Sequence, residues 1–324
     1  MSRRPRILNA EPDRYSPRAR AALEEVADVT EEALDRDGLM RAIPGYDALI
    51  VRLAHRVDGA LFDAAPRLRV VATATTGLDH IDLKAARDHG VEVLSLRGEN
   101  EFLRGVVATA EHTFAILLGL LRKIPSASAS AQRGEWDRDA FRGRELDGRR
   151  LGIVGLGRIG ERVARYGMAF GMEVRAYDRY REAWPEDVIR MPTLETLLET
   201  ADVLSIHVPS NEDTKGLIGR RQLSRLPAGA VVVNTARGAV LDGAALADFV
   251  KSGRIAGAAV DVVEGETGPG GLAADPLILA ARDSDHVLVT PHIGGATHES
   301  MEKTEVFMAR KLAAFLAVQV RPAL

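Results

Sequence analysis

Short runs of aliphatic and β-branched residues alternate along the chain with polar stretches of helix-compatible composition. In the first hundred residues, the runs that predict strands are Ile7–Asn9, Val26–Val29, Ala48–Val51, Val70–Thr73 and Val91–Leu94. After residue 150, the runs that predict strands are Leu151–Val154, Glu173–Tyr177, Val203–Val208, Ala230–Asn234, Ile255–Asp261 and Val287–Thr290. Strands that alternate with helices build parallel sheets. We therefore expect an α/β protein with two doubly wound parallel-sheet domains.

Two stretches between and after these sets show helical spacing of apolar residues. One runs from Gly105 to Arg122 and is expected to end before Pro125, and the other runs from Glu299 to Val318. The segment Ser126–Arg150 is small, polar and charged, so we expect it to be a surface connection.

Composition narrows the classes of function. A length of 324 residues is typical of two domains, and 43 basic against 46 acidic residues leave a net charge of −3. This balance predicts no binding to nucleic acid or to anionic membranes. The chain has no cysteine, which excludes disulfides, thiolate zinc sites and a cysteine nucleophile.

The patterns of a membrane span and of a signal peptide are both absent from the sequence, which predicts a cytoplasmic protein. The longest apolar run is far shorter than the ~20 residues of a membrane span, and no signal-peptide apolar region follows the N-terminal arginines. No metal-ligand spacing such as HExxH occurs, so we expect no metal site.

A glycine-rich turn follows the first predicted strand of the second set. It reads Gly155-Leu156-Gly157-Arg158-Ile159-Gly160 and precedes a helical pattern. In this context Gly155 allows the tight turn, Gly157 lets backbone N–H groups approach a pyrophosphate, and Gly160 lets helix and strand pack closely. The motif predicts a dinucleotide site at a helix N-terminus.

An acidic residue ends the next predicted strand. Asp178 lies 18 residues after Gly160, where a carboxylate would accept hydrogen bonds from ribose hydroxyls. This placement favours NAD. Arg179 and Arg181 follow and could support a 2′-phosphate, so NADP is the alternative.

Three further strand ends carry an arginine, an acid and a histidine. Arg237, Glu266 and His292 each follow a predicted strand of the second set, and the carboxyl ends of such strands face one ligand crevice. His292 would exchange the proton of an alcohol, Glu266 would orient the imidazole and favour its charged form, and Arg237 would hold a neighbouring carboxylate. Oxidation of a 2-hydroxy acid needs these groups.

With these motifs in place, the chain resembles the D-isomer-specific 2-hydroxyacid dehydrogenases, the family of D-3-phosphoglycerate, D-lactate and glyoxylate/hydroxypyruvate dehydrogenases. The likeness extends from the loop Thr75–Asp82 to the segment Thr290–Gly295. It implies a flavodoxin-like substrate domain, residues 1–100 plus 295–324, into which a Rossmann NAD-binding domain, residues 101–294, is inserted. It also implies a homodimer with its dimerisation segment at 101–150, and a substrate between the two domains.

The resemblance also assigns residues by position. The family's catalytic arginine, glutamate and histidine fall on Arg237, Glu266 and His292. Beside the glycine-rich turn with Arg158 and Ile159, and Asp178, the implied cofactor-binding positions are Val208, Pro209, Thr235, Ala236 and Asp261. The implied substrate-binding positions are Thr76, Gly77 and Leu78, whose backbone amides would grip a carboxylate. Arg52, at a strand end, is a further candidate for a substrate carboxylate or phosphate, or else a surface arginine.

Two departures from the family pattern concern loops. Glu266 is followed by Thr267 and a glycine-rich stretch, 268–271, where many relatives have proline, and Glu264 is a nearby competitor that the spacing from Asp261 disfavours. Residues 98–109 are longer than the connection in many relatives.

We therefore expect an NAD-dependent oxidoreductase that acts on a small D-2-hydroxy acid or its 2-keto partner. The alternative is an NAD(H)-sensing binding protein on the same fold, similar to the C-terminal-binding-protein corepressors. Those proteins retain the arginine, glutamate and histidine, so these residues alone do not separate the two functions.

Overall fold

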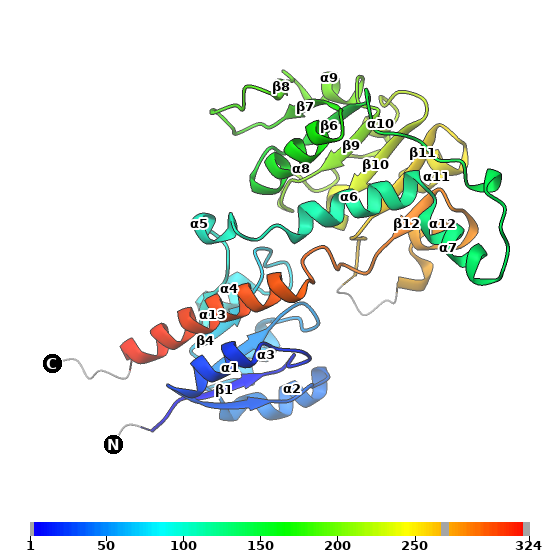
Figure 1. The fold of residues 1–324 in the computed structure, drawn as a ribbon. Helices are drawn as coiled ribbons and strands as arrows, with labels where there is room; N and C mark the ends of the chain where they lie inside the picture. The colour runs from blue at the N-terminus through cyan, green and yellow to red at the C-terminus, as the bar shows by residue number, and fades with distance from the viewer. Residues whose placement is uncertain (1–2, 267–271, 320–324) are drawn as a thin grey trace. The chain divides into compact units, whose positions relative to one another are not determined.

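The chain forms two compact units in a computed structural model that describes residues 3–266 and 272–319 (Figure 1). Unit 1 contains residues 1–106 and 296–324, and unit 2 contains residues 107–295. Unit 2 is thus continuous in sequence and interrupts unit 1. Residues 101–106 group with unit 1, whereas the resemblance implied that they belong to the inserted domain.

Unit 1 is built around a five-stranded parallel sheet. Its strands are β1 (Arg6–Asn9), β2 (Asp28–Glu31), β3 (Ala48–Val51), β4 (Val70–Thr73) and β5 (Glu92–Leu94). Its helices are α1 (Pro17–Glu24), α2 (Arg36–Ala42), α3 (Gly59–Asp63), α4 (Leu83–Asp88), α5 (Asn100–Leu103) and α13 (His298–Gln319). The strand order is β2-β1-β3-β4-β5, with every pair parallel.

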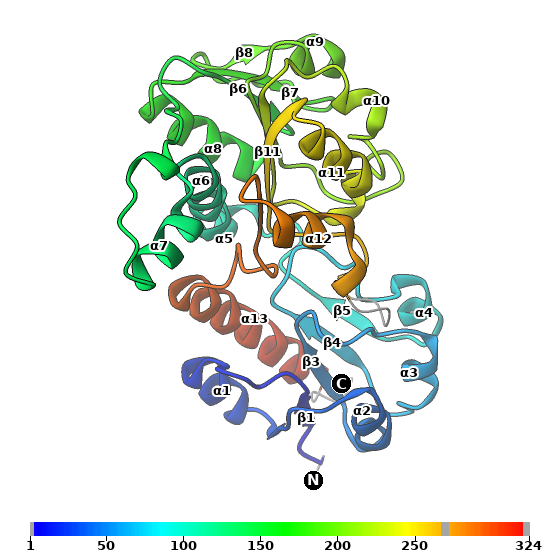
Figure 2. The same cartoon turned by 90° about the vertical axis from the view of Figure 1, so that its right-hand side faces the viewer.

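Both faces of this sheet are covered. Figure 2 shows α1 and α13 on one face and α2, α3 and α4 on the other. Successive strand residues point to opposite faces, so Leu49 packs toward α2 and α3 while Ala48 and Ile50 pack toward α1 and α13. Burial on both sides explains why β3 and β4 are continuous apolar runs rather than alternating ones.

Unit 2 is built around a seven-stranded parallel sheet. Its strands are β6 (Arg150–Val154), β7 (Glu173–Tyr177), β8 (Ile189–Arg190), β9 (Val203–Ile206), β10 (Ala230–Asn234), β11 (Ile255–Val260) and β12 (Val287–Val289). Its helices are α6 (Ala108–Leu121), α7 (Ile124–Gln132), α8 (Arg158–Ala169), α9 (Leu194–Leu198), α10 (Arg220–Leu223), α11 (Gly243–Lys251) and α12 (Pro276–Asp283). The strand order is β12-β11-β10-β9-β6-β7-β8. The chain adds β7 and β8 on one side of β6, then crosses to the other side of β6 and adds β9 to β12 there.

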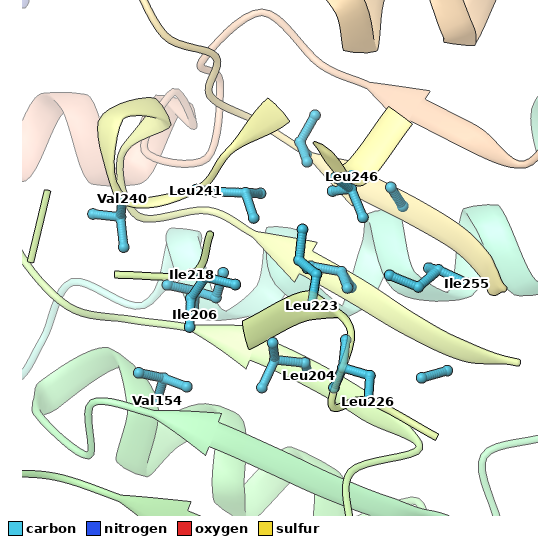
Figure 3. Packing of buried hydrophobic residues seen from close by; sticks show 14 of the residues in the cluster. Val154, Leu204, Ile206, Ile218, Leu223, Leu226, Val240, Leu241, Leu246 and Ile255 are labelled. Carbon is cyan, nitrogen blue, oxygen red and sulfur yellow. The ribbon is translucent and has the colours of Figure 1, made fainter. Parts of the chain in front are cut away.

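Two apolar clusters hold helices to the faces of the second sheet. Phe114 and Leu117 of α6 and Val163 of α8 pack on one face. On the other face α9 to α12 pack on strand residues such as Leu204 and Ile206 (Figures 2 and 3). Both sheets are therefore parallel and doubly wound, and the predicted fold class is confirmed.

The connection after α6 differs from the prediction. The segment Ser126–Arg150 is not wholly irregular, because α7 runs through its first part. Pro125 lies in the first turn of α7, where its missing N–H is tolerated, and the chain reverses at Lys123 with a φ of +53°. The sequence also failed to predict β8, a two-residue edge strand.

The segment 98–109 packs within unit 1 through its first half. The ring of Phe102 on α5 stacks on Phe307 of α13 with centroids 4.0 Å apart. By length and composition the stretch Asn100–Leu121 could cross a membrane, but this is weak evidence because buried core helices pass the same test. Its longer part, α6, contributes Phe114, Leu117 and Leu121 to the core of unit 2.

A buried carboxylate joins α13 to the start of α1. Glu305 is 2% exposed, and its Oε2 accepts a hydrogen bond of 2.7 Å from the backbone N–H of Ser16. Its Oε1 has no hydrogen-bond partner among the described residues, and the nearest cation, Arg52 Nη1, is 3.9 Å away. Burial raises the pKa of Glu305, and the Ser16 hydrogen bond only partly opposes this effect.

Because the pKa of Glu305 is raised, its ionised form should lower the free energy of unfolding, and this effect should depend on pH. A carboxyl whose pKa is higher in the folded chain stabilises the fold at low pH and loses that contribution as pH rises through the folded value. We expect Glu305→Gln to raise the free energy of unfolding at pH 8 by about 1–3 kcal/mol, the cost of a buried unsatisfied group, with the gain vanishing at low pH. Thermal unfolding across pH measures it, with Glu302→Gln on the exposed face of α13 as the control. A loss of stability at every pH would contradict it.

Candidate active site

The glycine-rich turn between β6 and α8 is shaped by two crowded glycines and one open glycine. Gly155 has a φ of +89°, and a Cβ there would lie 2.7 Å from the carbonyl oxygen of His207. A Cβ at Gly160 would lie 2.2 Å from the carbonyl oxygen of Gly155. A Cβ at Gly157 would meet nothing within 4 Å. The fold therefore requires Gly155 and Gly160, whereas the space above Gly157 fits a bound pyrophosphate at the N-terminus of α8.

Asp178 follows β7 and docks on the same turn. Its Oδ2 accepts a hydrogen bond of 2.8 Å from the backbone N–H of Leu156, and its Oδ1 accepts from Tyr180 and Arg181 N–H groups at 2.9 and 3.0 Å. The carboxylate thus lies on the glycine-rich turn and supports it, while its role toward a ribose stays a prediction.

The two arginines after Asp178 differ in how they are held. The Arg181 guanidinium forms an ion pair with Glu161 of α8 and donates to the carbonyl oxygen of Leu156. Arg179 is exposed, with its guanidinium 5.5 Å from the ring centroid of Tyr180. A 2′-phosphate would have to compete with Glu161 for Arg181.

The end of β9 carries two of the predicted cofactor-binding residues. Val208 lies against Gly155, and the carbonyl oxygen of Pro209 accepts a hydrogen bond of 2.6 Å from Thr214. His207 is half-buried, its Nδ1 is buried without a hydrogen-bond partner among the described residues, and its Nε2 lies 2.7 Å from Ser205 Oγ. Burial lowers the pKa of His207 to about 3, so this ring stays neutral.

The turn after β10 presents Arg237. The buried side chain of Asn234 accepts a hydrogen bond from Ala236 N–H at 3.0 Å and donates to the carbonyl oxygen of Arg237 at 3.0 Å. A Cβ at Gly238 would lie 2.1 Å from the carbonyl carbon of Val263. The Arg237 turn therefore packs directly on the backbone that leads to Glu266.

The same turn rests on α6. Thr235 is 6% exposed, and its hydroxyl lies 2.8 Å from that of Thr113. Thr235 and Ala236 therefore line the end of β10 with short side chains, where the resemblance implies cofactor-binding positions.

His292 and Glu266 form a close pair. His292 Nδ1 lies 2.6 Å from Glu266 Oε1, with 27% and 19% of the two side chains exposed. The structure thus brings together the histidine and the acid that the spacing selected, and Glu264 is exposed instead. The glycine-rich stretch 267–271, singled out in the sequence, lies outside the described residues.

Asp261, an expected cofactor-binding position, is buried and holds its neighbours along the chain. It is 2% exposed, and its carboxylate accepts hydrogen bonds from Thr290 Oγ1 at 2.6 Å and from the N–H groups of Ile293 and Gly294 at 2.9 and 2.7 Å. Its carbonyl oxygen accepts from His292 N–H at 2.8 Å. Asp261 therefore holds the segment that carries His292, and its role in binding a cofactor stays a prediction.

The predicted substrate-binding positions all lie in unit 1. Thr76, Gly77 and Leu78 follow β4, and the part of the chain described shows no intramolecular acceptor for their three backbone N–H groups. These groups can bind an anion. Arg52 follows β3; its Nη2 donates to the carbonyl oxygen of Asp13 at 3.2 Å, and its guanidinium lies 3.9 Å from both Glu11 and Glu305. The Arg52 charge is thus already shared with two carboxylates.

Several residues that build the site were not predicted. Asn234, Gly238, Thr113, His112 and Thr290 hold the turns that carry the predicted side chains. Of these five residues, Asn234 and Gly238 had a signal in the sequence, which is their position close to Arg237. Within residues 3–266 and 272–319, no three or more His, Asp or Glu side chains are grouped to hold a metal ion.

Comparison with known families agrees with this geometry. The model of the D-isomer specific 2-hydroxyacid dehydrogenase NAD-binding domain matches residues 114–294, which lie within unit 2. The chain belongs to the D-isomer specific 2-hydroxyacid dehydrogenase family. Among curated members, it is 36% identical to hydroxypyruvate reductase of Thermotoga maritima over 89% of this chain and 90% of that one.

Two other relatives extend the comparison. The chain is 37% identical to D-3-phosphoglycerate dehydrogenase of Archaeoglobus fulgidus over 86% of its own length, but it spans only about half (51%) of that protein. The solved structure of D-lactate dehydrogenase from Aquifex aeolicus, complexed with NAD and lactic acid, matches with a TM-score of 0.82, 29% identity, and 97% and 96% of the two chains covered. This dehydrogenase family therefore accounts for both units.

The two kinds of glycine in the turn predict different defects. Gly160→Ala forces a Cβ into the Gly155 carbonyl, so it should lower the melting temperature and weaken NADH binding. Gly157→Ala has room, so it should leave the melting temperature unchanged and still weaken NADH binding about tenfold or more by blocking the close approach of the pyrophosphate. Thermal unfolding without cofactor and fluorescence titration of NADH measure both, with Gly59→Ala in unit 1 as the control. Equal melting losses in both variants would contradict the distinction.

Proposed function

We propose that this protein is an NAD-dependent D-2-hydroxyacid dehydrogenase that reduces small 2-keto acids and oxidises the corresponding D-2-hydroxy acids. The observation that carries the proposal is the 2.6 Å contact between His292 Nδ1 and Glu266 Oε1, in the same family-matched NAD-binding domain as the glycine-rich turn. The relatives named hydroxypyruvate reductase and D-3-phosphoglycerate dehydrogenase support the class of substrate.

The histidine pair defines how a proton would move. Because Nδ1 of His292 faces Glu266, Nε2 is the ring nitrogen left to exchange a proton with the substrate oxygen. Glu266 orients the ring and stabilises the imidazolium that must be present when a keto acid is reduced. In the oxidative direction, neutral His292 accepts the hydroxyl proton at the same nitrogen.

Arg237 supplies the binding of an α-keto carboxylate in the proposal. It holds the carboxylate and polarises the carbonyl, and its interaction with the carbonyl oxygen strengthens as negative charge develops there. The backbone N–H groups of Thr76, Gly77 and Leu78 stay predicted donors to a substrate carboxylate. The bound nicotinamide would supply or accept the hydride, held by Gly155, Gly157 and Gly160, with Asp178 at the ribose.

NAD is the proposed cofactor. Asp178 would repel a 2′-phosphate, and Arg181, which could otherwise receive it, is paired with Glu161. A homodimer built on residues 101–150 and a cytoplasmic location stay predictions, as does the absence of nucleic-acid and membrane partners.

Turnover tests the proposal. We expect the wild type to reduce at least one of glyoxylate, hydroxypyruvate, pyruvate and phosphohydroxypyruvate, with a higher kcat/KM for NADH than for NADPH. Arg237→Ala should lower kcat/KM about 100-fold or more while NADH affinity changes little, because the guanidinium serves the reacting oxygen rather than the dinucleotide. Absorbance at the nicotinamide band follows turnover, and fluorescence titration follows NADH affinity. NADH binding without turnover of any keto acid would favour the NAD(H)-sensing alternative.

The two acids after β11 predict different effects on turnover. Glu266→Gln replaces the carboxylate that orients His292 and balances its cation, so kcat of keto-acid reduction should drop about tenfold. Glu264→Gln should leave kcat unchanged, because that side chain is exposed and is not the partner of His292. Steady-state rates of the two variants measure this. A loss of kcat in the Glu264 variant alone would assign the role to the other acid.

A further inference from the structure

A histidine on α6 reaches the end of β12, 178 positions further along the chain. His112 Nε2 lies 2.9 Å from Thr290 Oγ1 and 3.2 Å from Asp261 Oδ1. The single hydroxyl proton of Thr290 is donated to Asp261 Oδ1 at 2.6 Å, so the hydroxyl can only accept from His112. The contact with Thr290 therefore requires a proton on Nε2 of His112, and this N–H faces both oxygens.

This donor completes the hydrogen bonds of a buried carboxylate. Besides His112, Asp261 accepts from Thr290 Oγ1 and from the N–H groups of Ile293 and Gly294. Burial by itself would raise the pKa of Asp261, but these hydrogen bonds, first among them the one from His112, outweigh burial and hold the pKa below its usual value. The carboxylate is therefore charged, and the charged form can accept from all four donors at once.

The segment held by Asp261 has a strained backbone. His292 has a φ of +54°, a left-handed conformation that non-glycine residues seldom adopt. Its N–H donates to the carbonyl oxygen of Asp261 at 2.8 Å. A Cβ at Gly294 would lie 2.8 Å from Asp261 Oδ2, which shows how closely the segment wraps the carboxylate. Such strain persists where surrounding contacts over-determine it.

We propose that His112 is a positioning residue for His292. Through Thr290 and Asp261 it holds the turn 290–294 in the left-handed geometry that keeps the His292 ring against Glu266. His112 touches neither substrate nor cofactor in this proposal and acts only through Asp261 and Thr290. The role in turnover rests on the proposed function, whereas the effect on the turn does not.

Paired variants test the proposal with the full chain. His112→Leu removes the donor, and His112→Gln keeps an N–H near the position of Nε2. His286→Leu is the matched control, because His286 lies at the opposite end of β12, is exposed, and contacts the carbonyl oxygen of Ala256. Hydrogen exchange of peptides that cover 290–295 reports the turn without turnover, and steady-state kinetics report kcat and the KM for NADH separately.

The expected results separate positioning from a general structural role. His112→Leu should speed exchange in 290–295 about tenfold, the effect of losing one hydrogen bond, with exchange in β6 to β10 unchanged. Its kcat should fall about 10- to 100-fold while the KM for NADH changes less than threefold, since a displaced proton donor slows chemistry rather than cofactor binding. His112→Gln should recover most of both losses, and His286→Leu should show neither.

Distinct outcomes overturn the two levels of the proposal. Unchanged exchange in 290–295 in His112→Leu, or no recovery in His112→Gln, would overturn the holding of the turn by His112. Faster exchange with unchanged kcat would overturn positioning for the reaction. A wild type that turns over no 2-keto acid would overturn the proposed function, and the exchange result would still decide whether His112 holds the turn.

Discussion

The buried carboxylate of Asp261 joins the ends of β11 and β12, and the candidate site depends on this junction. Without it, the N–H groups of Ile293 and the buried Gly294 would lose the acceptor that holds them. The same carboxylate is tied to α6 through His112, so a helix, two strands and the turn that carries His292 meet at one group. A left-handed histidine can be maintained because several independent contacts require it.

Two buried carboxylates in this chain show how hydrogen-bond donors decide the charge of an acid. Asp261 and Glu305 are both 2% exposed. Asp261 has four donors, and its pKa is lowered; Glu305 has one backbone donor, and its pKa is raised. Burial acts in the same direction on both, so the number of donors makes the difference. One carboxylate organises a turn as a stable anion, while the other places a poorly compensated charge between α1 and α13.

Close backbone contacts position the functional turns of unit 2. Parallel strands bring their carboxyl ends to one edge, but this only places the turns in the same region. Gly238 removes a side chain where the Arg237 turn meets Val263, and Gly160 does the same where α8 meets Gly155. Because protein interiors are close-packed, a single Cβ at either position would displace a turn. The glycines therefore set distances that side-chain hydrogen bonds, such as those of Asn234, then maintain.

The sequence by itself determined the features that depend on neighbours along the chain. Alternation of apolar and polar runs predicted the two parallel sheets, and the glycine-rich turn predicted the dinucleotide site. The spacing from Asp261 in the family that the sequence resembles selected Glu266 over Glu264 as the partner of His292. Only the tertiary structure decided that Asp261 supports the His292 turn, that His112 reaches Thr290, and that Arg52 shares its charge with Glu11 and Glu305. The physical reason is distance along the chain: Asp261 and Thr290 are 29 positions apart, and His112 and Thr290 are 178. Periodicity reports the face on which a residue lies, whereas the packing of α6 against β11 and β12 decides which side chain it meets.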